Sequence, residues 1–234
     1  MFFTILIIGE LCYMDASATF EPLNTSIILL YTSCIVGALP LALFITSDEL
    51  EITLEKAINL LKTILPPYAF FGCGPQVGPI VFITDDSNAE HNALELCWPN
   101  SIRLLCTFHV LQAFWRWLYD SKHRIDKEDR VPIIEKMKKI LYTPSILEME
   151  THYIEFAQSF YHSYPLLKKH FEHLWERRNF WALSFRLRLP MRGNNTNNYI
   201  ERSFCTLKDI IFSRYCIIIS VYSEFNIINN LLII

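Results

Sequence analysis

Three acidic residues from distant parts of the chain, Asp15, Asp85 and Glu201, could together bind divalent metal ions. Asp15 lies in the first strand-like segment, Asp85 directly follows the apolar run "VFIT", and Glu201 lies beside the apolar stripe of the last helical segment. Hard cations such as Mg²⁺ or Mn²⁺ take oxygen ligands and leave positions for water and phosphate. Two such ions about 3.5–4 Å apart can activate a nucleophile and stabilise a leaving oxygen in phosphodiester chemistry. The spacing alone is a weak signal, because surface or helix-capping acids give the same pattern.

Other acids have a structural explanation in the sequence. The stretch from Thr46 to Glu49 fits a capping box, with Thr46 at the N-cap and Glu49 at the third helical position, and Ser87-x-x-Glu90 fits a second one. Asp48, Glu49 and Glu90 are therefore predicted to serve helix starts rather than a chemical site.

The elements that must position the three candidates alternate between strand and helix. Strands are expected in the apolar, β-rich runs. The first is "ELCYMDASATF", which is expected to end at Asp15, and two more lie within residues 24–47 on either side of Gly37. The last two are "GPIVFITDD" and "SIRLLCTFHV". Helices are expected where apolar residues recur at helical spacing, which is over 50–65, after Ser87, in "LQAFWRWLYD", through 128–186, and in a last helix with Ile200, Phe204, Leu207 and Ile211 on one face. This order predicts an α/β fold with a mixed sheet flanked by helices and an all-helical insertion before the last helix.

Composition indicates a chain that can bury a real core and that has an uneven charge distribution. Of its 234 residues 52% are hydrophobic and 19% charged, and the net charge is -3. Residues 1–129 hold 7 Lys+Arg against 15 Asp+Glu, whereas residues 130–214 hold 14 against 8. A basic region beside metal-binding acids suits a polyanion, although a solvated charged surface explains the same counts.

The cysteines and the apolar runs indicate where in the cell the protein is expected. The seven cysteines occur singly, which favours reduced, intracellular thiols. No apolar run reaches the roughly 18 uninterrupted residues that span a bilayer, so no membrane contact is predicted. The apolar start "MFFTILIIGELC" has neither the basic residues nor the cleavage site of a signal peptide.

Several motifs in order resemble one enzyme family. The run "TDDSNAEHNALELCWPNSIRLLCTFHVLQAFWRWL" is similar to the catalytic core of Mutator-like element (MULE) transposases, in which strand, Asp, helix, Trp-Pro and Cys-x-x-His follow one another. "MDASATFEPLN" resembles the family's first Asp motif, "GALPLALFITSDE" its following hairpin, and "RGNNTNNYIERSFCTLKDIIFSR" the segment with the catalytic Glu. The resemblance extends over about residues 10–214.

The resemblance implies an RNase H-like fold and an Asp-Asp-Glu site that binds Mg²⁺ or Mn²⁺, with Asp15, Asp85 and Glu201 as the catalytic and metal-ligating residues. Asp85 is preferred over Asp86, because the family aspartate directly follows the apolar-Thr strand ending. Asp86 is expected to assist the following helix N-terminus. Cys106 and His109 match the Cys-x-x-His signature. Since even Cys97 leaves a four-ligand zinc site incomplete, they are predicted to be a buried structural or site-supporting pair without zinc.

The same resemblance implies domains and partners. Residues 1–127 would form the RNase H-like core, 128–190 a helical insertion, 191–214 the helix with the catalytic Glu, and 215–234 an atypical end, truncated or divergent. Because the stripes of the helical block are aromatic and its linkers are short, we expect the block to share the core of the sheet. The implied partner is DNA in the nucleus, and self-association into a homo-oligomer is left open. The contacts to DNA phosphates would come from basic side chains, namely Arg186, Arg188, Arg192, Arg202 and Lys208.

Three functions remain open at this point. The chain could cut and join DNA strands, it could be a domesticated DNA-binding regulator, or it could be a nonfunctional remnant. Family members generally carry an upstream zinc module and a longer C-terminal region, neither of which is recognisable here. Weak DNA binding and little strand transfer are therefore expected of this chain alone.

Overall fold

The computed structural model describes residues 9–17, 26–34, 37–207 and 232–233. They divide into two compact units, with the division falling inside the fifth strand. The sheet unit contains the residues up to Arg103 and those from Asn197 onward, and the helical unit contains Leu104–Thr196. The helical unit thus begins earlier than the predicted insertion at residue 128.

A mixed sheet forms the centre of the sheet unit. Its strands are β1 (Leu11–Ser17), β2 (Ser26–Cys34), β3 (Gly37–Thr46), β4 (Val81–Thr84), β5 (Ile102–Leu105) and the two-residue β6 (Leu232–Ile233). Their order across the sheet is β5-β4-β1-β2-β3-β6. β2 is antiparallel to β1 and β3, whereas β1 and β4 are parallel. The predicted α/β class with a mixed sheet and flanking helices is confirmed.

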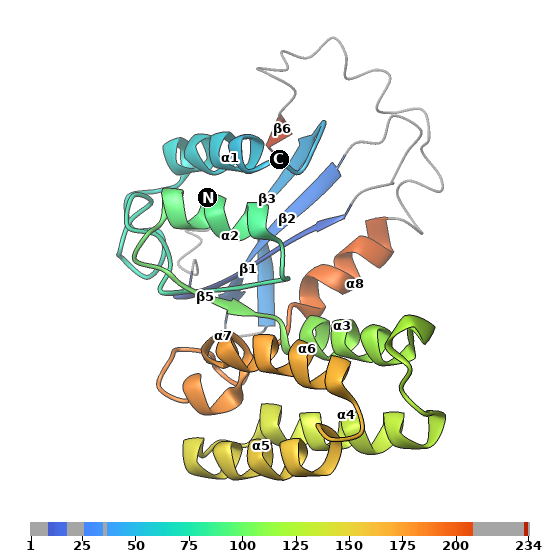
Figure 1. Cartoon of the computed structure of the whole chain (residues 1–234). Helices are drawn as coiled ribbons and strands as arrows, with labels where there is room; N and C mark the ends of the chain where they lie inside the picture. Colours follow the sequence, from blue (N-terminus) through green and yellow to red (C-terminus); the bar gives the residue numbers. More distant parts are fainter. Residues whose placement is uncertain (1–8, 18–25, 35–36, 208–231, 234) are drawn as a thin grey trace. The chain divides into compact units, whose positions relative to one another are not determined.

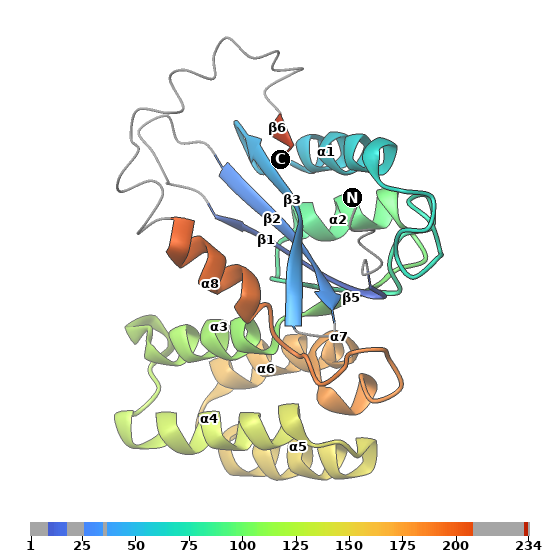
Figure 2. The ribbon, with the colours of Figure 1, turned by 180° about the vertical axis from the view of Figure 1, so that it is seen from behind.

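The two faces of the sheet carry different side chains, because neighbouring residues of a strand point in opposite directions. In β1, Cys12 and Met14 belong to the buried cluster that also contains side chains of α1 (Glu51–Ile64) and α2 (Asn88–Cys97). Tyr13 and Asp15 alternate with them. Figure 1 shows α1 and α2 together on one face of the sheet. From behind, in Figure 2, the last described helix, α8 (Asn198–Thr206), lies beside β1 and β2.

The two predicted capping boxes have different outcomes. The box at Thr46 is wrong, because Thr46 is the last residue of β3 and α1 begins five residues later with Leu50 at its N-cap. Asp48 still serves this start, since its carboxylate accepts a hydrogen bond from the Leu50 N–H at 3.0 Å. At α2 half of the box is confirmed: the Ser87 hydroxyl accepts a hydrogen bond from the N–H of Glu90 at 3.4 Å.

The helical unit consists of short helices around its own aromatic core. They are α3 (Thr107–Tyr119), η1 (Ser121–His123), α4 (Lys127–Tyr142), α5 (Ile146–Phe160), α6 (Pro165–Glu176), α7 (Arg178–Trp181) and η2 (Leu183–Phe185). The strand predicted through residue 110 ends at Leu105, because Cys106 is already the N-cap of α3.

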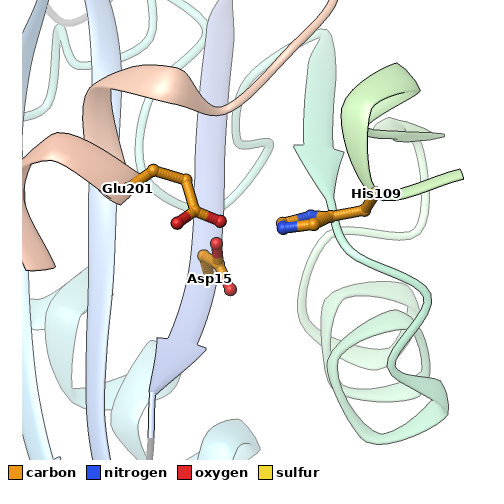
Figure 3. Close-up of side chains that lie close together, drawn as sticks. All are labelled: Asp15, His109 and Glu201. Atoms are coloured by element: carbon orange, nitrogen blue, oxygen red, sulfur yellow. The ribbon is translucent and has the colours of Figure 1, made fainter. Parts of the chain in front are cut away.

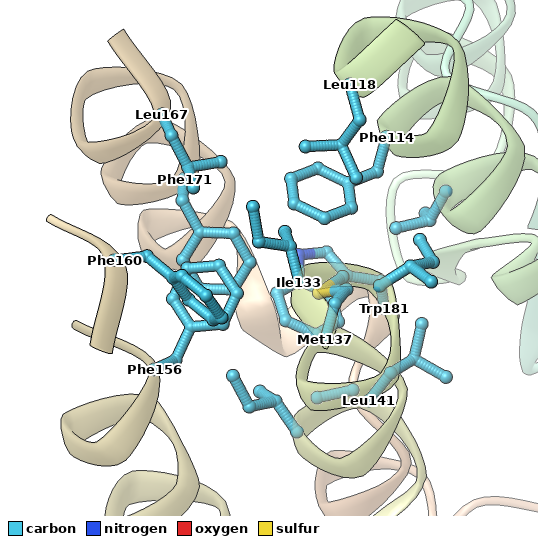
Figure 4. Packing of buried hydrophobic residues seen from close by; sticks show 14 of the residues in the cluster. Phe114, Leu118, Ile133, Met137, Leu141, Phe156, Phe160, Leu167, Phe171 and Trp181 are labelled. Atoms are coloured by element: carbon cyan, nitrogen blue, oxygen red, sulfur yellow. The ribbon is translucent and has the colours of Figure 1, made fainter. Parts of the chain in front are cut away.

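The predicted aromatic stripes do pack inside this unit. Phe156, Phe160 and Phe171 are buried, and the rings of Phe156 and Phe171 stack 4.1 Å apart (Figure 4). The whole cluster, from Leu105 to Ala182 with partly buried residues up to Phe185, comes from the helical unit. The expectation that the stripes would join the core of the sheet is therefore wrong. Within the described part of the chain, no helix is long and apolar enough to cross a membrane.

Candidate metal-binding carboxylate site

The register of two parallel strands brings Asp15 and Asp85 to the same edge of the sheet. Tyr13 in β1 pairs with Ile83 in β4, so the residues two positions further along both strands are Asp15 and Asp85. Asp15 is buried, with 4% of its surface exposed, and Asp85 is half-buried. The Asp85 carboxylate accepts a hydrogen bond from the Ser87 N–H at 3.1 Å, which fixes its position ahead of α2.

Glu90 is a third acid at this place. Each of Asp15, Asp85 and Glu90 has a carboxylate oxygen within 4.8 Å of one from the other two. Glu90 comes from the first turn of α2 and is 1% exposed. Its buried oxygens have no partner within hydrogen-bonding geometry, although Asp85 is near enough to share a proton if Glu90 is protonated.

Glu201 approaches Asp15 from α8. Carboxylate oxygens of the two residues lie within 4.8 Å of one another, and Figure 3 shows the two groups pointing toward each other. Glu201 lies in the first turn of α8 and is half-buried. Asp15 therefore has a metal-sized spacing both to the pair formed by Asp85 and Glu90 and to Glu201.

Asn197 connects α8 to Asp15 directly. It occupies the N-cap position of α8, where an Asn side chain ordinarily accepts a hydrogen bond from the helix backbone, yet it makes no such bond. Its side-chain amide instead donates to Asp15 Oδ2 at 2.6 Å, and the residue is fully buried. A donor at this distance stabilises the charged form of the carboxylate.

Aromatic contacts hold α8 against the sheet. The Tyr199 ring meets the Tyr13 ring edge-on at 6.0 Å, and the hydroxyls of Tyr31 and Ser203 are hydrogen-bonded at 2.6 Å. Gly37 lies under Tyr199, since a Cβ on this residue would come within 3.2 Å of the ring. These contacts fix the rotation of α8 that turns Glu201 toward Asp15.

Charge accumulates at this edge of the sheet. Burial raises the pKa of Glu90 well above its ordinary value, and the negative charges of Asp85 and Asp15 raise it further. Glu49, which was expected to be a capping acid, contributes to the same repulsion. Clustered carboxylates suit a hard divalent cation, which takes oxygen ligands and supplies the opposite charge. The donor set thus fits Mg²⁺ or Mn²⁺.

Among the residues proposed for this site, Asp85 is placed differently from its neighbour. Asp85 belongs to the group with Asp15 and Glu90, whereas Asp86 is exposed and belongs to neither of the potential metal-binding groups found among the described residues. The preference for Asp85 therefore has a geometric reason. Glu90 and Asn197 were missed: the capping pattern accounted for Glu90, and Asn197 stood in a polar loop without a signature of its own.

The predicted phosphate contacts fall into different environments. Arg186 is 1% exposed, and its guanidinium donates to the backbone carbonyls of Leu105, Phe180 and Asn195. Its prediction as a phosphate contact is wrong, because the side chain is already engaged inside the helical unit. The exposed side chains are those of Arg188, Arg192 and Arg202, and Lys208 lies outside the described residues.

The Cys-x-x-His residues lie at the start of α3. Cys106 is fully buried at the N-cap of this helix and His109 is half-buried in its first turn. Cys97 is in the sheet unit, where its thiol lies 3.8 Å from the carbonyl oxygen of Glu55 and from the side-chain oxygen of Asn59. The role of Cys106 and His109 remains a prediction.

Comparisons with known proteins add no family. Neither a scan against protein-family models nor a search of curated proteins finds a match.

Proposed function

We propose that this chain is a transposase-type catalytic domain that cuts and joins DNA strands by phosphoryl transfer assisted by Mg²⁺ or Mn²⁺. The observation that carries the proposal is the convergence of Asp15 with Asp85 on one side and with Glu201 on the other, all within the sheet unit. When bound there, divalent cations would activate the attacking oxygen and stabilise the leaving oxygen.

The fold supports this proposal at a coarser level. The strand order β5-β4-β1-β2-β3, with β2 antiparallel to both of its neighbours, is compatible with an RNase H-like sheet. In such a sheet the acids at the ends of adjacent strands and an acid from a packed helix can share one site. The MULE transposase resemblance supplies the same three positions independently of the geometry.

The chain's own residues would orient this site. Asn197 holds the Asp15 carboxylate from one side, and the Ser87 N–H holds Asp85. Exposed Arg188 and Arg202 are candidates for contacts to DNA phosphates, one from each unit. Contacts of this kind position a nucleic acid without reading its sequence, and they weaken as salt rises.

The decisive experiment compares two adjacent substitutions of equal charge. The purified chain is incubated with supercoiled plasmid and with a DNA duplex in the presence of Mn²⁺ or Mg²⁺, and nicked and joined products are resolved on gels. We expect slow, metal-dependent nicking that Asp85→Asn abolishes and Asp86→Asn retains. Equal activity of the two variants would refute the assignment of Asp85.

A DNA-binding protein without cleavage is the second candidate. The burial of Asp15 and its hydrogen bond to Asn197 would also suit a carboxylate that only stabilises the fold. Salt-sensitive DNA binding together with a complete absence of Asp85-dependent nicking would favour this alternative. Binding is measured by fluorescence anisotropy on a labelled duplex over a range of salt concentrations.

A further inference from the structure

Helix capping does not explain the position of the Glu90 carboxyl group. In a complete capping box the glutamate side chain returns to the backbone N–H of the N-cap serine. Here the Ser87 N–H donates to Asp85 instead, and no N–H donor reaches either oxygen of Glu90; only Asp85 is near enough to share a proton with it if Glu90 is protonated. Only 1% of Glu90 is exposed. A buried carboxyl group without partners is costly, and its presence calls for a physical reason.

The neighbours of Glu90 supply that reason. Its carboxylate points to the oxygens of Asp15 and Asp85, and the three ligand atoms lie within 4.8 Å of one another. Ligand oxygens of Mg²⁺ lie about 2.0–2.1 Å from the ion, so two ligands opposite each other are about 4 Å apart. Three oxygens with the observed spacing need only small side-chain movements to contact one ion.

We propose that Glu90 is a third protein ligand, with Asp15 and Asp85, for a hard divalent cation at the carboxyl edge of β1 and β4. The inference deepens the proposed function, on which the catalytic use of the ion rests, but the binding of the ion does not depend on DNA. Glu201 then faces Asp15 from α8 and belongs to a second position that shares Asp15.

A purely structural role for Glu90 makes a different prediction. A buried glutamic acid that is kept protonated would be replaced by glutamine with little change in shape and with no effect on metal binding. The substitution Glu90→Gln therefore separates the two roles, because it keeps the volume and removes only the charge and the ligand strength. Because it also removes a buried charge, the variant should fold at least as stably as the wild type when metal is absent.

The test measures Mn²⁺ binding to the full chain without DNA. Free Mn²⁺ is followed by electron paramagnetic resonance during titration of the wild type, Glu90→Gln, and the exposed neighbour Asp86→Asn as the matched control. We expect Glu90→Gln to weaken Mn²⁺ binding by roughly tenfold or more, since even residues that only support a metal ligand change affinity by about 10- to 100-fold. Asp86→Asn should bind Mn²⁺ like the wild type. Circular dichroism and the melting temperature in EDTA verify that all three proteins are folded.

Unchanged Mn²⁺ affinity in folded Glu90→Gln would overturn the inference, and so would a wild type that binds no Mn²⁺ at millimolar concentration. The result is independent of the proposed function. Glu90-dependent Mn²⁺ binding without DNA cleavage would leave this inference standing and remove the catalytic proposal. Asp85-dependent cleavage with Mn²⁺ binding unaffected by Glu90→Gln would do the reverse.

Discussion

Replacement of Arg186 by methionine should destabilise the helical unit strongly. The guanidinium donates to the carbonyl of Phe180 at 2.8 Å, to that of Leu105 across a long sequence separation, and to that of Asn195 at 3.4 Å. Burial lowers its pKa to about 10, yet the group stays charged at neutral pH. Arg186 thus connects the end of β5, the α7 segment and the loop before α8.

The size of the effect follows from the two short hydrogen bonds. A buried carbonyl that loses its donor costs about 1–3 kcal/mol, and the bond at 3.4 Å contributes little. Two such carbonyls give a loss of about 3 kcal/mol, because methionine retains part of the apolar packing. With a urea dependence of about 1–3 kcal/mol per molar, the unfolding midpoint should fall by about 1–3 M.

The assay follows urea unfolding by tryptophan fluorescence, to which the buried Trp181 of the same unit contributes. Arg188→Met is the matched control, since Arg188 is exposed and its loss should leave the midpoint nearly unchanged. The reasoning would be refuted by an Arg186→Met protein with an unchanged midpoint and weakened DNA binding, because that outcome would make Arg186 a phosphate contact after all.

Two further predictions concern the sheet unit. Tyr31→Phe removes the hydroxyl that is hydrogen-bonded to Ser203 at 2.6 Å. The free energy of unfolding measured in urea should therefore fall by about 1 kcal/mol. An unchanged value would mean that this contact does not hold α8 against the sheet. The pKa of Glu90 is raised in the folded state, so the protonated side chain favours folding. This contribution to the free energy of unfolding is fully present below the pKa of about 4.3 in the unfolded chain, and it is lost as the pH rises through the pKa of the folded state. Glu90→Gln should therefore stabilise the metal-free protein at pH 8, and the gain should shrink toward pH 4 in urea titrations with EDTA; a gain independent of pH would contradict the raised pKa.

The part of the site that could be predicted from the sequence is the part fixed by strand register. An apolar run that ends in an acid shows where a buried strand stops, and parallel neighbours bring such ends to one edge. Asp85 follows the apolar end of β4 in this way, whereas Asp15 lies inside β1, which continues to Ser17, and its selection rested on the family resemblance. The spacing of Ile200 and Phe204 correctly predicted the buried side of α8. The end of β4 and the buried side of α8 depend on local periodicity, which a sequence shows directly.

Errors arose where one pattern fits two environments. The start of α1 was placed early because Thr46 to Glu49 fits a capping box, although the β2–β3 pairing extends β3 through Thr46. Arg186 was grouped with exposed arginines because its burial depends on carbonyls as far away as Leu105. Pairing and burial of this kind are set by tertiary contacts, which local propensity does not encode.

Glu90 and Asn197 show the same ambiguity at the site itself. Ser87-x-x-Glu90 is a capping signature, and the structure keeps its serine half while turning the glutamate toward Asp15 and Asp85. Asn197 is a good N-cap residue by type and position, yet its side chain accepts no hydrogen bond from the helix backbone, and its amide N–H donates to Asp15. In both cases a side chain that could satisfy a helix end is directed to the carboxylates instead. The start of α2 keeps its cap from Ser87, whereas the start of α8 has no side-chain cap, a bond of about 1 kcal/mol. The starts of two helices thus direct polar side chains to the same aspartate, an arrangement that helix stability does not explain. Binding of a cation, as proposed above, would account for both.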